Sequence, residues 1–186
     1  MGFFIEYLKN PRRIGAVAPS GINLSKKMMQ PIDFTSASVI VEYGPGTGSF
    51  TRELIKRRKP DTALILIEQN ERFCEELKKK YSDQSNLYLI NGYAENVVQY
   101  LKEYGFEKAD YIVSGLPFTS LPGKVSDSIL TATKKAIGNS GIFITFQYSL
   151  VKKKFFEKYF KITCYLKEIK NLPPAYVLVM KNNCRE

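Results

Sequence analysis

Residues 38–49 read S-V-I-V-E-Y-G-P-G-T-G-S, a β-branched run that leads directly into three alternating glycines. The run predicts a buried parallel strand over 38–43, because such strands are apolar on both faces. The glycines at its end let the backbone approach a ligand without obstruction by Cβ atoms. Glu68 follows 20 residues after Gly48, where an acid can accept hydrogen bonds from ribose hydroxyls. Loop and acid together predict a nucleoside-cofactor site.

The rest of the chain alternates apolar runs with segments of helical spacing. This alternation predicts a parallel sheet with right-handed crossovers and helices on both faces. A later pair of apolar runs, joined by a short loop, predicts a terminal β-hairpin. The expected fold is α/β and Rossmann-like, with a mostly parallel seven-stranded sheet in one domain spanning residues 1–186. We expect further strands at 63–67, 86–90, 109–113, 141–146, 162–169 and 176–180, and helices at 50–58, 71–81, 95–104, 121–137 and 150–159.

The composition excludes several kinds of chemistry. The chain has no histidine, which removes a Ser-His-Asp triad, a histidine-ligated metal and any imidazole base. Its three cysteines form no CxxC pair, so we expect a reducing compartment and no metal. No stretch approaches the roughly 20 apolar residues of a membrane-spanning helix. These features predict a cytoplasmic protein.

The net charge of +10 favours a polyanionic partner, either RNA or an anionic lipid surface. A solvated basic surface without a partner is the plainer alternative. Ahead of the expected sheet, residues 1–37 form an extension in which Ser20 is placed to cap a helix that runs to about Gln30. The first residues suit either a core helix or an interfacial membrane anchor, because they combine apolar and basic side chains: Phe3, Phe4, Tyr7, Leu8, Lys9, Arg12 and Arg13.

The glycine spacing distinguishes among cofactors. Nicotinamide-binding loops read GxGxxG, and a Walker loop needs GK[ST], whereas residues 42–48 read E-Y-G-P-G-T-G. That pattern resembles class I methyltransferases that use S-adenosylmethionine (SAM), a cofactor that presents an ammonium and a carboxylate in place of phosphate. The resemblance implies SAM as the cofactor. It implies cofactor-binding roles for Glu42, Tyr43, Gly44, Pro45, Gly46, Gly48, Glu68, Gln69, Tyr93, Ala94, Glu95 and Ser114.

A second informative segment, I-V-S-G-L-P-F at 112–118, follows the fourth expected strand. Ribosomal RNA adenine dimethyltransferases, which the chain resembles overall, read N-L-P-[YF] here, and their asparagine grips the target amino group. This chain has Gly115 in that place. The S-G-L-P version resembles bacterial phospholipid N-methyltransferases, as do residues 10–20, F-Q-Y at 146–148 and N-L-P-P-A at 171–175.

The lipid resemblance implies successive methylation of a phosphatidylethanolamine-type amine by an enzyme peripheral to the inner face of the membrane. RNA adenine methylation is the alternative, although ribosomal dimethylases carry an extra helical domain after the catalytic sheet. A SAM-binding protein without catalysis is a third possibility. The sequence departs from both families at Asn91-Gly92-Tyr93-Ala94, where they usually read G-D-A.

Methyl transfer requires in-line attack of a neutral amine on the sulfonium methyl, so the protein mainly orients two reactants. Tyr148 is the expected proton relay or hydrogen-bond partner, with a structural tyrosine as the alternative. Phe118 and Tyr148 could attract the cationic groups through their rings, and Phe118 could equally be a packing residue. The predicted catalytic surface comprises Tyr148, Ser114, Gly115, Leu116, Pro117 and Phe118.

Overall fold

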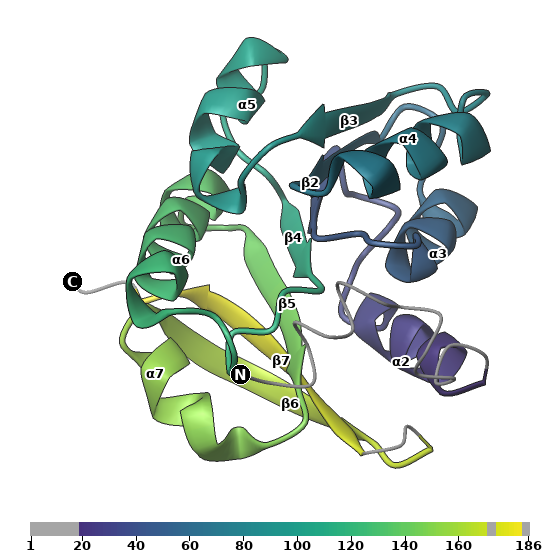
Figure 1. Ribbon diagram of the computed structural model, residues 1–186. Helices are drawn as coiled ribbons and strands as arrows, with labels where there is room; N and C mark the ends of the chain where they lie inside the picture. The colour runs from purple at the N-terminus through teal and green to yellow at the C-terminus, as the bar shows by residue number, and fades with distance from the viewer. Residues whose placement is uncertain (1–18, 171–173, 184–186) are drawn as a thin grey trace.

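The computed structural model describes residues 19–170 and 174–183. The expected N-terminal anchor segment and residues 171–173 of the expected N-L-P-P-A motif lie outside these ranges. Seven strands form one sheet in the order β3-β2-β1-β4-β5-β7-β6 (Figure 1). All neighbouring pairs are parallel except those that β7 makes with β5 and β6. The strands are β1 (Val39–Tyr43), β2 (Ala63–Glu68), β3 (Leu87–Asn91), β4 (Tyr111–Ser114), β5 (Ile142–Gln147), β6 (Phe160–Glu168) and β7 (Ala175–Asn182).

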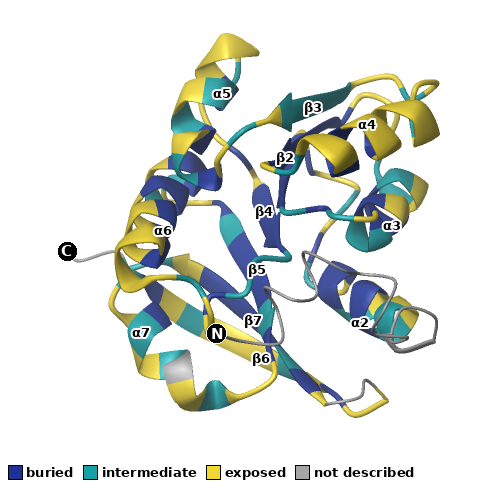
Figure 2. Ribbon diagram, viewed as in Figure 1, coloured by how far each residue is buried: buried dark blue, intermediate teal, exposed yellow. Residues whose placement is uncertain are grey.

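Helices cover both faces of the sheet. Successive strand residues point to opposite sides, so each strand contributes to two cores. Val41 belongs to a core that includes residues of three helices: α5 (Val97–Glu103), α6 (Gly123–Ile137) and α7 (Lys153–Glu157). Ile40 belongs to a second core with α2 (Pro19–Met29) and α3 (Ser49–Arg57). The remaining helix, α4 (Glu71–Lys80), connects β2 to β3. Figure 2 shows the central strands largely buried, the edge strands β3 and β6 less so, and the outer surfaces of the helices exposed. The α/β fold predicted from the sequence is confirmed.

Three predicted helices differ in detail from the structure. The one expected at 95–104 begins as a 3-10 turn, η1 (Ala94–Asn96), before α5. The one expected at 150–159 divides into η2 (Leu150–Lys152) and the shorter α7. Helix α2 begins at Pro19, so Ser20 lies inside the helix and is not its cap. Proline suits that first position because its missing N–H would have no helical partner there. Within the described ranges, no helix is long and apolar enough to cross a bilayer.

The parallel strands bring their carboxyl ends to one edge of the sheet. The last residue of β1, Tyr43, is level with Ser114 on β4, and Ser114 is level with Thr145 on β5. Strand β6 also ends at this edge, because β6 and β5 each run antiparallel to β7. The end of β6 and the start of β7 therefore lie at the same edge as the glycine loop. Ligands of open α/β sheets bind at this edge.

Candidate functional site

The glycine loop is shaped by backbone conformations that side chains rarely adopt. Gly44, Gly46 and Gly48 have φ angles of +61°, +55° and +83°, all in the left-handed region that favours glycine. The Gly44 N–H donates to the carbonyl of Ile67 at 2.9 Å, and the Gly48 N–H donates to that of Pro45 at 2.9 Å. A Cβ atom at Gly46 would meet no other atom within 4 Å. The loop is therefore held at both ends and open in the middle, as a ligand cradle requires.

Glu42 lies directly beneath this loop and is completely buried. One of its carboxylate oxygens accepts a hydrogen bond from the Thr51 hydroxyl at 2.8 Å, while the other has no partner among the described residues. Burial raises the pKa of Glu42 to about 8, and the nearby charge of Glu68 adds to the rise, whereas the Thr51 hydrogen bond opposes it. A buried oxygen without a partner is suited to a cationic donor. The ammonium of SAM is such a group, so Glu42 fits the predicted cofactor.

Glu68 ends β2 and connects two parts of the predicted cofactor site. One oxygen accepts from the Gly46 N–H at 3.0 Å, and the other accepts from the Asn70 N–H at 2.9 Å. Each carboxylate oxygen has a second lone pair, so Glu68 can still accept from ribose hydroxyls. The carboxylate thus has a structural role that the sequence did not reveal, because it fixes the centre of the glycine loop.

The segment after β3 lies beside Glu68. The Gly92 N–H donates to the Glu68 carbonyl at 2.9 Å, which aligns the two strand ends. The expected cofactor residues here differ in accessibility: Gln69 is exposed, Ala94 is buried and Glu95 is half-buried. Tyr93 is 58% exposed, so its ring is available for stacking on a flat ligand. These four predicted residues lie around one end of the site, and their contacts with SAM stay a prediction.

The predicted acceptor segment follows β4. Ser114 is fully buried, and its hydroxyl accepts from the Leu116 N–H at 3.2 Å. The Gly115 N–H donates to the Tyr43 carbonyl at 2.9 Å. A Cβ atom at position 115 would lie 2.9 Å from the Gly44 carbonyl oxygen and 3.7 Å from the Phe50 ring. Leu116 and Pro117 are half-buried. The acceptor segment therefore packs directly on the glycine loop.

An aromatic group stands beside Gly115. The rings of Phe50 and Phe146 meet edge to face with centroids 5.9 Å apart, and those of Phe146 and Tyr148 do so at 5.5 Å. Tyr148 is 50% exposed, so it is a surface residue of this group. We refer to Phe50, Phe146 and Tyr148 as the aromatic group below. Phe50 lies at the start of α3, Phe146 near the end of β5 and Tyr148 directly after that strand, so the group lies at the ligand-binding edge.

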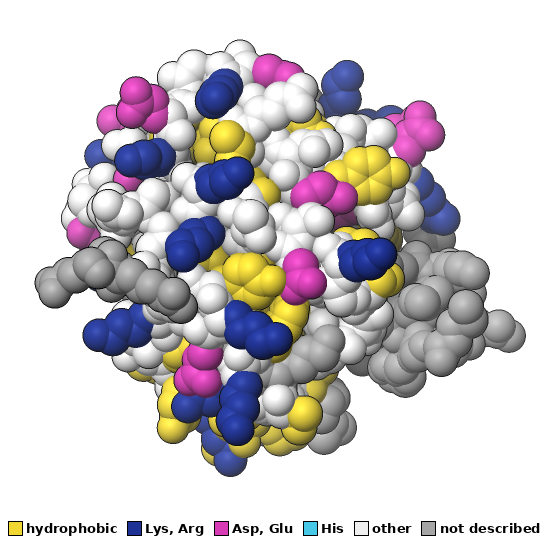
Figure 3. Space-filling model, turned by 90° about the vertical axis from the view of Figure 1, so that its left-hand side faces the viewer, with side chains coloured by type: hydrophobic (Ala, Val, Ile, Leu, Met, Phe, Trp, Pro, Cys, Tyr) yellow, Lys and Arg dark blue, Asp and Glu magenta, His cyan; other side chains and the backbone are white. Residues whose placement is uncertain are grey.

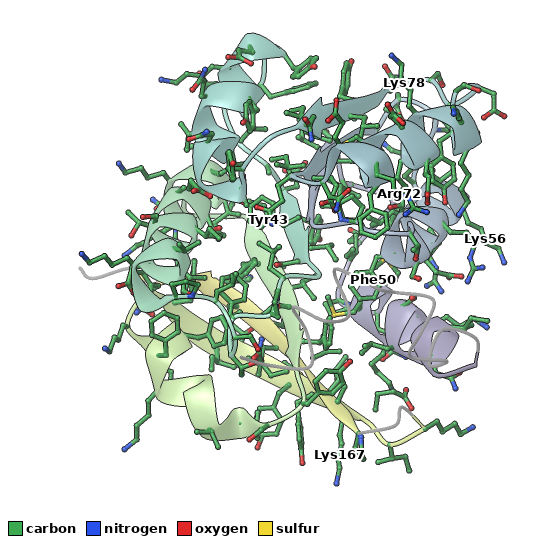
Figure 4. All side chains as sticks on the ribbon, viewed as in Figure 1. Tyr43, Phe50, Lys56, Arg72, Lys78 and Lys167 are labelled. Atoms are coloured by element: carbon green, nitrogen blue, oxygen red, sulfur yellow. The ribbon has the colours of Figure 1, made fainter. Side chains whose placement is uncertain are left out.

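Two predicted site residues have side chains directed into the core. The Tyr43 ring is fully buried and its hydroxyl lies 3.2 Å from that of Thr133 on α6, so only the backbone of Tyr43 faces the loop. Figure 4 shows Tyr43 on the α6 side of the sheet and Phe50 toward α2. The Phe118 ring is also fully buried, edge to face with Phe143 and Phe156. The structure thus favours the packing alternative for Phe118, because a ring without exposed surface cannot contact a cationic substrate.

Sequence reasoning missed several residues at the site. Phe50 follows the glycine loop by two positions and Thr51 by three, in the first turn of α3. That turn begins where the loop ends, which is the signal that could have identified both. Gln147, next to Tyr148, is buried, and its amide nitrogen has no partner among the described residues.

Comparisons with known proteins agree with this geometry. The family model for ribosomal RNA adenine dimethylase matches residues 6–166. The chain is 31% identical over 175 residues to an ornithine lipid N-methyltransferase of Singulisphaera acidiphila, covering 93% of this chain and 91% of that protein. It is 33% identical over 101 residues to ribosomal RNA small subunit methyltransferase A of Mycoplasma mycoides, covering 53% of this chain and 36% of that one.

Solved structures show the same fold at low sequence identity. The N-methyltransferase NodS from Bradyrhizobium japonicum, in complex with S-adenosylhomocysteine, has a TM-score of 0.72 at 11% identity and 96% coverage of both chains. The likeness to adenine dimethyltransferases and lipid N-methyltransferases is confirmed by these relatives. SAM is the cofactor, as the glycine loop predicted. The chain therefore belongs to the ribosomal RNA adenine dimethylase family and is a SAM-dependent methyltransferase.

Proposed function

We propose that this methyltransferase acts on the amine of a membrane lipid head group of the phosphatidylethanolamine type. The observation that carries the proposal is the glycine at position 115. A side chain there would start 2.9 Å from the Gly44 carbonyl oxygen, a distance that forces a backbone shift. The position is thus built without a side chain, and no amide is available at this point to grip the amino group of a nucleobase.

The aromatic group supports a cationic or amine acceptor. The Phe50 ring lies 3.7 Å from the Cβ position of residue 115, and Phe146 and Tyr148 continue the aromatic surface from Phe50. Ring faces attract ammonium groups by about 0.5–2 kcal/mol, depending on how far they are desolvated. Aromatic side chains also recognise quaternary ammonium groups, the form that an amine reaches after full methylation. The surface therefore suits substrates and products of successive methylation.

The residues present can support the transfer without covalent catalysis. SAM supplies an electrophilic methyl group. Gly115 and Leu116 hold the acceptor segment against the glycine loop, which sets the distance between the two reactants. An ammonium acceptor must first lose a proton, and the half-exposed Tyr148 hydroxyl can pass that proton to solvent.

The relatives give further support. The alignment with the ornithine lipid enzyme spans nearly all of both proteins, whereas the alignments with the ribosomal enzymes of Mycoplasma mycoides and Sulfurihydrogenibium cover 36% and 42% of those proteins. Ornithine lipid also presents an amine in a membrane head group. Phosphatidylethanolamine and ornithine lipid share that chemistry, and the experiment below distinguishes them.

The test incubates the enzyme and radiolabelled SAM with vesicles that contain phosphatidylethanolamine, ornithine lipid or only phosphatidylcholine. A parallel reaction contains deproteinised ribosomal RNA. We expect label in the phosphatidylethanolamine vesicles and none in phosphatidylcholine or RNA. Label confined to ornithine lipid would correct the head group while keeping the lipid class. Label in RNA adenine, with unlabelled lipids, would establish the alternative function and overturn the proposal.

The matched variant for this test is Gly115→Asn. A new side chain at position 115 must displace the Gly44 carbonyl, which would lie 2.9 Å from its Cβ atom. We expect lipid methylation to fall by at least about tenfold, the consequence of losing roughly 1.4 kcal/mol of positioning. Labelled RNA from either version would count against the lipid assignment. Unchanged lipid methylation in the variant would show that the acceptor does not pass this position.

A further inference from the structure

We infer that a lysine-rich groove between α2 and the β6–β7 hairpin docks the enzyme on anionic phospholipid bilayers, with its substrate edge toward the head groups. The inference rests on the proposed function, because docking on a membrane serves an enzyme whose substrate is a lipid. Its evidence, the charges and position of the groove, is independent of the substrate. The groove has a volume of about 430 Å³. Four of its lining residues are lysines, namely Lys26, Lys27, Lys167 and Lys170.

Glu168 lines the groove and contacts both of its walls. It is buried, one carboxylate oxygen accepts from the Lys170 N–H at 2.8 Å, and the other lies 3.9 Å from the Lys27 ammonium. This acid therefore joins the hairpin to α2 and fixes the two walls of the groove relative to each other. Its single negative charge is paired with Lys27. Lys26 and Lys170 add positive charge that Glu168 does not neutralise, which makes the groove complementary to an anionic surface. The Lys167 ammonium lies over the Tyr176 ring, 5.8 Å from its centroid.

The groove lies on the same edge and the same face of the sheet as the aromatic group. Gln147, the last residue of β5, is level with Tyr176, and Tyr176 is level with Lys167. Two interstrand spacings separate Gln147 from Lys167, which is about 10 Å. Phe146 and Leu166 both pack against the core that contains residues of α2. Lysines bound to lipid phosphates would thus hold Tyr148 close to the same membrane surface.

Apolar side chains accompany these charges. Ile169 lines the groove and is 68% exposed, and Val151, shortly after Tyr148, is 87% exposed. Exposed apolar residues beside lysines are typical of proteins that bind at the bilayer interface. The face formed by α5, α6 and α7 carries acidic side chains among its basic ones (Figure 3). Figure 4 shows Lys167 at the hairpin end, well separated from Lys56 and Lys78.

The test compares two charge-reversal variants of the whole protein. The groove variant is Lys26→Glu with Lys170→Glu, one substitution on each wall. The matched control, Lys56→Glu with Lys78→Glu, makes the same change in net charge on α3 and α4, and all four lysines are exposed. Melting temperature and SAM affinity establish that both variants fold. Sedimentation with vesicles of phosphatidylglycerol in phosphatidylcholine then measures docking, since neither lipid offers a primary amine to the active site.

We expect the groove variant to bind these vesicles at least about 30-fold more weakly than the wild type, because each lysine near an anionic surface contributes roughly fivefold in affinity. The control should bind like the wild type, and added salt should weaken both. Equal loss in the two variants would mean that net charge alone drives binding and would overturn the inference. Unchanged vesicle binding by the groove variant would also overturn the inference. The same holds if the groove variant loses binding to ribosomal RNA but keeps binding to vesicles.

Detergent-dispersed lipid separates this inference from the proposed function. The groove variant should methylate a lipid amine in neutral micelles at the wild-type rate, because the groove lies outside the catalytic surface. If the wild type methylates no lipid amine in any form, the proposed function fails, while the vesicle sedimentation still decides the docking surface. If the groove variant methylates micellar lipid poorly despite normal SAM binding, the lysines act in catalysis and the docking role is wrong.

Discussion

The buried acid beneath the glycine loop predicts an unusual dependence of stability on pH. Glu42 has a pKa of about 8 in the folded chain, against an ordinary value of 4.5. Between these values the folded state keeps a proton that the unfolded state has lost. The free energy of unfolding must therefore fall as pH rises, by about 1.4 kcal/mol per pH unit from this group. Stability from this source is fully present below about pH 4.5 and is lost progressively up to about pH 8.

The perturbation is Glu42→Gln, which removes the ionisable group and keeps an oxygen to accept from Thr51. From about pH 5.5 to about pH 7.5, the ligand-free wild type should lose roughly 2 to 3 kcal/mol more than the variant. The absence of histidine makes the comparison clean, because no imidazole titrates in this range. Comparing the pH slopes also cancels any constant effect of the new amide.

Urea denaturation at several pH values measures the two slopes directly. Equal slopes in wild type and variant would refute the reasoning, because they would mean that Glu42 is already ionised in the folded chain. A second measurement uses calorimetry of SAM binding in buffers of different ionisation enthalpy. If the SAM ammonium pairs with Glu42, binding near neutral pH should release a proton in the wild type and none in Glu42→Gln.

Three further predictions concern the same site. Gly46→Val should abolish SAM binding in calorimetry while the protein stays folded. Position 46 has φ of +55°, and the valine side chain would fill the open space beside the loop. Unchanged SAM affinity would show that the loop is not part of the cofactor site. Glu68→Ala should weaken SAM binding by about 1.5–3 kcal/mol, since ribose contacts and the Gly46 hydrogen bond are both lost; a loss below about 0.3 kcal/mol would assign the ribose to another group. Gln147→Leu should raise the unfolding free energy by about 1 kcal/mol, because it removes a buried amide nitrogen without a described partner. If its lipid methylation also stays at the wild-type level, Gln147 has no role in positioning the acceptor.

The fold was predictable because each of the five parallel strands is a short, mainly apolar run. Buried parallel strands are apolar on both faces, and the chain places glycine, proline or charge between them. The same property hid the direction of Tyr43. When both faces of a strand are buried, alternation does not say which side a given side chain takes, so the sequence did not show that the Tyr43 ring contacts Thr133 in the core.

The site was predictable only where it depends on backbone. The glycine loop and Glu68 were found from spacing, since strand ends and turns fix their position. Contacts between elements distant in sequence were not: Phe50 meets Phe146 across 96 positions, and no local pattern signals that pairing. Likewise, the double hydrogen bonding of Glu68 depends on how the loop folds back over β2.

The hydrogen bond from Gly46 to Glu68 has a kinetic consequence for turnover. It holds the loop in shape before any ligand arrives, so little ordering entropy is lost on binding. Loop and acid would contact parts of the cofactor that survive methyl transfer unchanged. Contacts of this kind stabilise spent and fresh cofactor equally and cannot distinguish them. The demethylated product should therefore compete strongly for the enzyme, and the methylation rate should follow the ratio of the two forms more closely than the SAM concentration itself.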